Sequence, residues 1–134
     1  MLYGEARELL KEEDQKEAIM IGFTAVNRAN DSIEGNGKSI KEAILKKYQY
    51  SCFNSNDPNL KELKNPEKYD PKSWEKALSL SEKILEGKFA HLNYGQDHYH
   101  TKKIASPKWA KSPRMKKVWG QPYFKHSFYR NSKA

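Results

Sequence analysis

Residues 14–29 constrain the fold of this chain more than any other segment, because apolar side chains would cover almost every face of a helix there. The segment closes with Asn27-Arg28, and its apolar positions are Ala18, Ile19, Met20, Ile21, Phe23, Ala25 and Val26. A helix that is apolar nearly all round is buried on most of its sides. The sequence therefore predicts a central helix over 14–29 with the other elements packed around it.

Three further helices are predicted around this one. Residues 3–13 favour a first short helix, and Ser39-Ile40-Lys41-Glu42 has the capping-box pattern that starts a helix running to about Lys47. Asp70-Pro71 opens a helix over about 71–86, which Gly87 ends. The buried positions predicted for that last helix are Trp74, Ala77, Leu78, Leu80, Ile84 and Leu85.

Two segments lack a helical pattern. Residues 48–70 are rich in Asn, Pro, Asp and Tyr, which predicts a long irregular segment. Residues 88–134 contain short extended pieces, prolines and many aromatic residues. The expected fold class is therefore α+β and mostly helical, with a small sheet or irregular region from the C-terminal third forming one wall of a cleft. With 134 residues, no repeat and no linker, the chain suits a single domain, 1–134.

The charge of the chain is unevenly distributed. The net charge is +8, yet residues 98–134 carry ten Lys or Arg and no Asp or Glu, whereas the first 97 residues carry 15 basic and 17 acidic side chains. Aromatic residues are interleaved with the basic ones. A basic, aromatic surface suits a nucleic acid, an anionic cell wall or an anionic membrane, and it also serves solubility alone.

Several classes of protein are not supported by the sequence. No apolar run approaches the roughly 18 residues of a membrane span. No signal-peptide pattern is visible, because an acidic residue occurs as early as Glu5 with no apolar region before it. A single cysteine, Cys52, excludes an internal disulfide framework.

Glu5 is the candidate catalytic residue. It lies in Leu2-Tyr3-Gly4-Glu5-Ala6-Arg7, at the start of a helix-forming stretch and near residues that can bury it. A half-buried carboxylic acid has a raised pKa, as a general acid working near neutral pH requires. The alternative for an isolated Glu at a helix start is a favourable interaction with the helix dipole.

Two other segments carry groups that suit a sugar ligand. Gln49 and Ser51 offer donors and acceptors for hydroxyls, and Tyr50 can stack on a sugar face. From these residues alone, an irregular loop with aromatic anchors and a buried Cys52 is the favoured interpretation. In a strand, His98 and His100 would point to the same face.

With Asp97 and His126, these two histidines form a possible metal set, but the spacing typical of zinc ligands is missing. Histidines that bond sugar hydroxyls or backbone in a polar cleft are the favoured reading, so no metal or other cofactor is predicted.

Five short motifs occur in the order found in one family of enzymes. They are Glu5-Ala6-Arg7, Asn27-Arg28, Gln49-Tyr50-Ser51-Cys52, His98-Tyr99-His100 with Pro107-Lys108-Trp109-Ala110, and His126-Ser127-Phe128-Tyr129. In this the chain resembles the SleB/CwlJ-type cell-wall hydrolases, the spore cortex-lytic enzymes and their phage endolysin relatives. It departs from them after Arg7, where many members read Gly-Glu and this chain reads Glu8-Leu9.

The resemblance implies a lysozyme-like catalytic domain that cleaves the β-1,4 bond between N-acetylmuramic acid and N-acetylglucosamine in peptidoglycan. It implies a lytic transglycosylase, or a muramidase if water attacks instead, with Glu5 as its catalytic residue and no cofactor. The residues expected to bind substrate are Tyr3, Gln49, Tyr50, Ser51, His98, Tyr99, His100 and Trp109. Glu5 is expected at the floor of the cleft, facing Gln49–Ser51 on one side and Tyr99–His100 on the other.

The expected partners are peptidoglycan glycan strands and an anionic envelope surface, with the protein acting as a monomer. The expected setting is a phage-type lysin that is held in the host cytoplasm before release to the wall, or carried in a virion. The alternatives are a small basic nucleic-acid-binding module that uses residues 98–134, a metal-dependent wall amidase that uses the histidines, and an inactive relative that binds wall sugars.

Overall fold

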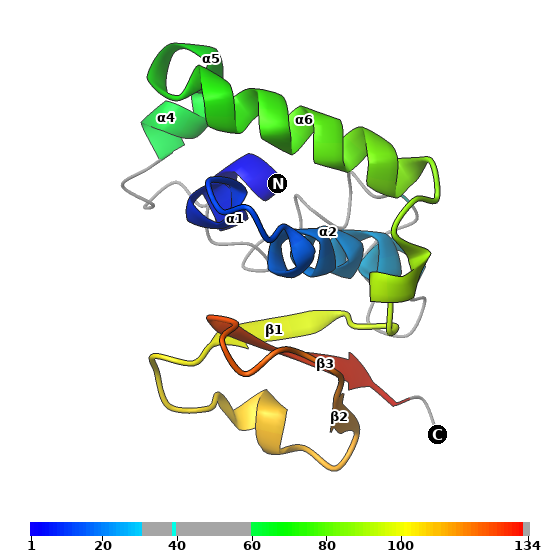
Figure 1. Ribbon diagram of the computed structural model, residues 1–134. Coiled ribbons are helices and arrows are strands. Elements are labelled where there is room, and N and C mark those ends of the chain that lie inside the picture. The colour runs from blue at the N-terminus through cyan, green and yellow to red at the C-terminus, as the bar shows by residue number, and fades with distance from the viewer. Residues whose placement is uncertain (31–38, 40–59, 133–134) are drawn as a thin grey trace.

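The computed structural model describes residues 1–30, 39 and 60–132, which form a layer of helices over a small antiparallel sheet (Figure 1). This arrangement confirms the predicted α+β, mostly helical fold class. The elements are α1 (Leu2–Leu10), α2 (Lys16–Ala29), α4 (Leu60–Lys64), α5 (Pro66–Tyr69), α6 (Pro71–Leu85), the 3-10 turn η2 (Ala90–Leu92), β1 (His98–Thr101), the 3-10 turn η3 (Lys108–Lys111), β2 (Met115–Lys117) and β3 (His126–Asn131).

Helix α2 lies at the centre of the molecule, with α1 and α6 on one side and the sheet on the other (Figure 1). Its residues from Glu17 to Ala25 are all buried, as the apolar pattern predicted. At Gly22 the helix approaches α6 so closely that a Cβ would lie 2.6 Å from Cδ1 of Ile84. A glycine is therefore what allows these two helices to pack at this distance.

Helix α6 begins and ends where the sequence predicted. The carboxylate of Asp70 accepts a hydrogen bond from the backbone N–H of Ser73 at 3.2 Å, which caps the helix and lowers the pKa of Asp70. Beyond its other end, Gly87 has a φ of 88°, a left-handed conformation that glycine adopts at little cost.

Two of the buried positions predicted for α6 are wrong. Leu78 is 43% exposed and Leu85 is 63% exposed. The face of α6 that packs against the core carries Ser73, Ala77, Leu80 and Ile84. Leu78 and Leu85 each follow a residue of that face by one position, which rotates them about 100° around the helix towards solvent.

Two other predicted segments also differ from the structure. Helix α1 stops at Leu10 instead of residue 13, and its helical backbone is interrupted at Ala6 (φ −130°, ψ 21°). The segment predicted as irregular over 48–70 contains the short helices α4 and α5, because Pro66 occupies a first-turn position where its missing N–H is harmless. The helix predicted after Ser39 and the segment 48–59 lie outside the described residues.

The sheet is antiparallel in the order β1-β3-β2. Tyr99 pairs with Phe128 and His100 pairs with Ser127, so alternate residues of the two strands share a face. Phe128, which is 1% exposed, and Tyr99 pack against the core beneath the helices. The opposite, outer face of the sheet carries His98, His100 and Tyr129. Within the described ranges, no helix has the length and apolar character needed to cross a membrane.

Candidate functional site

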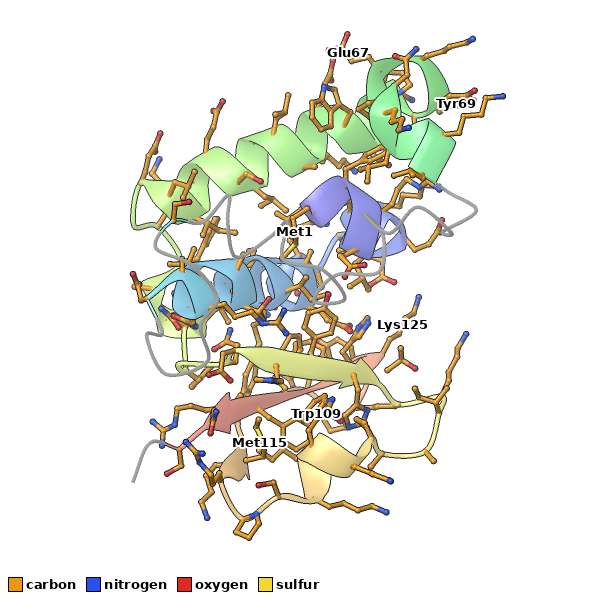
Figure 2. The ribbon with its side chains drawn as sticks, turned by 180° about the vertical axis from the view of Figure 1, so that it is seen from behind. Met1, Glu67, Tyr69, Trp109, Met115 and Lys125 are labelled. Carbon is orange, nitrogen blue, oxygen red and sulfur yellow. The ribbon has the colours of Figure 1, made fainter. Side chains whose placement is uncertain are left out.

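A cavity of about 300 Å³ opens between the helical layer and the start of β3. Residues 3–9 of α1 form one wall, Leu63 of α4 adds a short apolar stretch, and Lys125 and His126 form the opposite side. Lys125 projects from the start of β3 on the side of the molecule where α1 lies (Figure 2). The volume is at the lower end of the range for small-ligand pockets.

The side chain of Glu5 is half-buried in the wall of this cavity. The hydroxyl of Tyr99, in β1, donates a hydrogen bond to Oε1 of Glu5 at 3.0 Å. The first helix and the sheet therefore meet at this carboxylate, and the predicted approach of Tyr99 to Glu5 is confirmed.

Tyr3 lines the same cavity but is mostly covered by its neighbours. It is 3% exposed, and its ring meets Trp74 edge to face at 5.9 Å. Nη1 of Arg7 donates to the Tyr3 hydroxyl at 3.1 Å, and the guanidinium lies 5.2 Å from the centre of the ring. Tyr3 is thus firmly packed, and little of its surface is available to a ligand.

His98, His100 and Trp109 lie on the outer face of the sheet, away from Glu5. Trp109 reaches that face from η3 (Figure 2), and its ring centre is 5.0 Å from that of His98 and 5.8 Å from that of His100. The expectation that His100 faces Glu5 is wrong, because neighbouring residues of a strand point to opposite faces and Tyr99 takes the inner one.

Sugar binding by His98, His100 and Trp109 stays a prediction, for a surface distinct from the cavity. Gln49, Tyr50 and Ser51, the other expected substrate-binding residues, lie outside the described residues.

The histidines considered as a metal set are separated by the sheet. His126 pairs across the sheet with Thr101, on the inner face that carries Tyr99, whereas His98 and His100 are on the outer face. No group of three or more His, Cys, Asp or Glu side chains comes together as a metal site in residues 1–30, 39 and 60–132. The metal-dependent alternative therefore lacks its ligand set in this part of the chain.

The loop before β1 is held by the end of α2. Nδ2 of Asn27 donates to the carbonyl of Gln96 at 2.7 Å, and Nε of the buried Arg28 donates to the carbonyl of Asp97 at 2.6 Å. These bonds place the start of β1, and with it Tyr99, relative to the helices. The Asn-Arg pair at the end of the apolar helix thus has a positioning role.

Sequence reasoning missed a polar pair next to Glu5. Glu17 of α2 is 5% exposed, and its carboxylate accepts from Nδ1 of His126 at 2.6 Å and from the backbone N–H of Lys125 at 3.1 Å. The ring of His126 meets that of Tyr99 edge to face at 5.3 Å. The signal was present in the sequence, because a carboxylate at the start of a buried helix needs a partner from another element.

Comparison with known families identifies the class. The chain matches the family model described as Cell Wall Hydrolase over residues 12–129, so it belongs to this family, in agreement with the SleB-type resemblance. No curated protein and no solved structure matches the chain. The protein is therefore an enzyme that acts on the cell wall, and its family implies a peptidoglycan substrate. The matched range begins after Glu5, so the role of that residue depends on its geometry.

Proposed function

We propose that the protein is a glycosidase that cleaves the β-1,4 bond between N-acetylmuramic acid and N-acetylglucosamine, with Glu5 as its general acid. One observation carries the proposal: the half-buried carboxyl of Glu5 lines a cavity and is held there by the hydroxyl of Tyr99. A fixed carboxyl at the edge of a pocket can reach the glycosidic oxygen of a bound sugar. Oriented acids of this kind are what glycoside cleavage requires.

The proposed reaction is that of a lytic transglycosylase. Glu5 protonates the departing glycosidic oxygen, and the acetamido group of the substrate stabilises the positive charge that develops on the sugar. The C6 hydroxyl of the same sugar then attacks C1 and gives its proton to the Glu5 carboxylate, and a 1,6-anhydro ring closes. If water attacks in its place, the same site produces hydrolysis.

The basic surface is proposed to keep the enzyme near its substrate. The Lys and Arg side chains of residues 98–132 are exposed, including Lys102, Lys103, Lys116 and Lys117. Peptide carboxylates of peptidoglycan and other anionic envelope groups would be attracted to this surface. That the protein is a phage-type lysin stays a prediction.

The test is a mass spectrum of the soluble products released from purified peptidoglycan. Products lighter than hydrolysis products by one water molecule, absent with Glu5→Gln, would support a lytic transglycosylase that acts through Glu5. Products with free reducing ends, lost in the same variant, would make the enzyme a hydrolase at the same site. Glu13→Gln is the control, since it makes the same chemical change at an exposed position. Unchanged products from Glu5→Gln would refute the proposal.

A further inference from the structure

The buried pair Glu17–His126 lies next to the proposed catalytic acid and has no part in the mechanism described above. The side chain of Glu17 is 6% exposed and that of His126 is 15% exposed. A carboxylate removed from water is costly unless it is paired and hydrogen-bonded. Glu17 meets this requirement with two donors, the imidazole of His126 and the backbone N–H of Lys125.

The hydrogen bond to Glu17 determines how the imidazole is presented. A carboxylate accepts hydrogen bonds, so Nδ1 of His126 carries the proton in this contact. The neutral ring then has its lone pair on Nε2. Within the described ranges no group bonds Nε2, and His126 lines the cavity that also contains Glu5. The cavity therefore holds a carboxyl and an oriented imidazole.

Tyr99 connects the two groups. Its hydroxyl bonds Glu5 and its ring packs edge to face against His126, so one side chain of β1 contacts both groups. Glu5 and His126 are therefore suited to acid–base catalysis, in which one group donates a proton and another accepts one.

We propose that His126 is a second catalytic residue, the base that takes the proton of the nucleophile in place of the Glu5 carboxylate, and that Glu17 is its positioning residue. This inference rests on the proposed glycosidase function. Glu5 gives its proton to the glycosidic oxygen as the C1–O bond breaks, and the leaving sugar departs as an alcohol. Water or the C6 hydroxyl then forms the new bond to C1, and its proton passes to Nε2 of His126. Transfer of one proton from the imidazolium back to Glu5 restores both groups.

The chain contains a matched pair that serves as a control. Nδ1 of His98 lies 2.9 Å from the carboxylate of Asp97, whose Oδ1 also accepts the backbone N–H of Asn131. The side-chain exposures are 15% and 7%, close to those of the first pair. This second pair lies on the outer face of the sheet beneath Trp109. It has the same chemistry but no access to the cavity.

The experiment is chemical rescue of His126→Ala with free imidazole, measured as kcat and KM on purified peptidoglycan. We expect kcat to fall by about 10²- to 10⁴-fold, the usual contribution of a general base, while KM changes little. Imidazole at millimolar concentration should restore part of the loss in a saturable manner. In His98→Ala, no loss of activity should be restored by imidazole. A loss in His126→Ala that imidazole does not restore, or no loss at all, would overturn the proposal.

Two further variants separate this inference from a structural role and from the proposed function. His126→Gln can still bond Glu17 but cannot take up a proton, so it should retain the stability of the wild type and lose kcat. Wild-type activity in this variant would overturn the role of His126 alone. Glu17→Gln should lower kcat at unchanged KM, as expected for a residue that orients the imidazole. Activity left in Glu5→Gln would instead overturn the proposed function itself.

Discussion

Replacing Gln96 with leucine should remove much of the stability of the domain, because this side chain joins α2 to the loop before β1. Gln96 has no exposed surface. Its Nε2 donates to the carbonyls of Met20 at 3.2 Å and Leu92 at 3.0 Å, and its Oε1 accepts from the backbone N–H of Tyr94 at 2.7 Å. Both ends of the amide are therefore used.

The magnitude follows from these contacts. A typical hydrogen bond inside a protein contributes about 1 kcal/mol net, so the three lost bonds amount to about 3 kcal/mol. Leucine has a similar volume, so little additional cost from a cavity is expected. A domain of this size loses roughly 4 °C in Tm per kcal/mol, so Gln96→Leu should lower Tm by roughly 12 °C.

The assay is thermal and urea unfolding followed by circular dichroism, with Gln121→Leu as the matched control. The side chain of Gln121 is half-buried and makes no hydrogen bond to any described residue. Its replacement should therefore change the free energy of unfolding by less than about 0.5 kcal/mol. An equally small change in the free energy of unfolding for Gln96→Leu would mean that its three hydrogen bonds do not stabilise the domain as expected.

Three other predictions concern the backbone, pH and salt. Gly95 has a φ of 78°, and an added Cβ would lie 2.9 Å from Cδ of Arg130. Gly95→Ala should therefore lower the free energy of unfolding by about 1–2 kcal/mol in a urea titration. An unchanged midpoint of unfolding would contradict this prediction. The N–H of Ser73 lowers the pKa of Asp70 below 3.8, so Asp70 contributes stability that is present above that value and lost as the pH falls through its folded pKa. The stability advantage of the wild type over Asp70→Asn should thus shrink between about pH 5 and about pH 2, and a constant difference in Tm would count against it. Binding to peptidoglycan sacculi in a pull-down should weaken as the salt concentration rises to about 1 M, where the Debye length is about 3 Å. Binding that does not change with salt would contradict the proposed role of the basic surface.

The helical part of the fold could be predicted because its signals are local. The apolar run of α2 requires burial whatever surrounds it, and Asp70-Pro71 and Gly87 mark the ends of α6 by backbone chemistry alone. Leu78 and Leu85 were expected to be buried because they are apolar, but their angular positions around the helix turn them towards solvent. A residue one position away from the buried face of a helix lies about 100° further around it and can be exposed although it is apolar.

The site was only partly predictable because it depends on contacts between distant segments. Glu5 and Tyr99 are 94 residues apart, and Glu17 and His126 are 109 residues apart. No local pattern says which face of β1 turns towards the helices, so His100 was expected beside Tyr99 in the cleft. Pairing between the strands decides it, and the same pairing places His126 near Glu5.

The most direct test of the account is a comparison of Glu5→Gln with the wild type in the release of soluble fragments from purified peptidoglycan, with binding to the same material measured in parallel. We expect the variant to bind as the wild type does, to unfold at the same urea concentration and to release no glycan fragments. Glu13→Gln should release them at the wild-type rate. Fragment release by Glu5→Gln at a rate near that of the wild type would show that this carboxyl is not the catalytic acid.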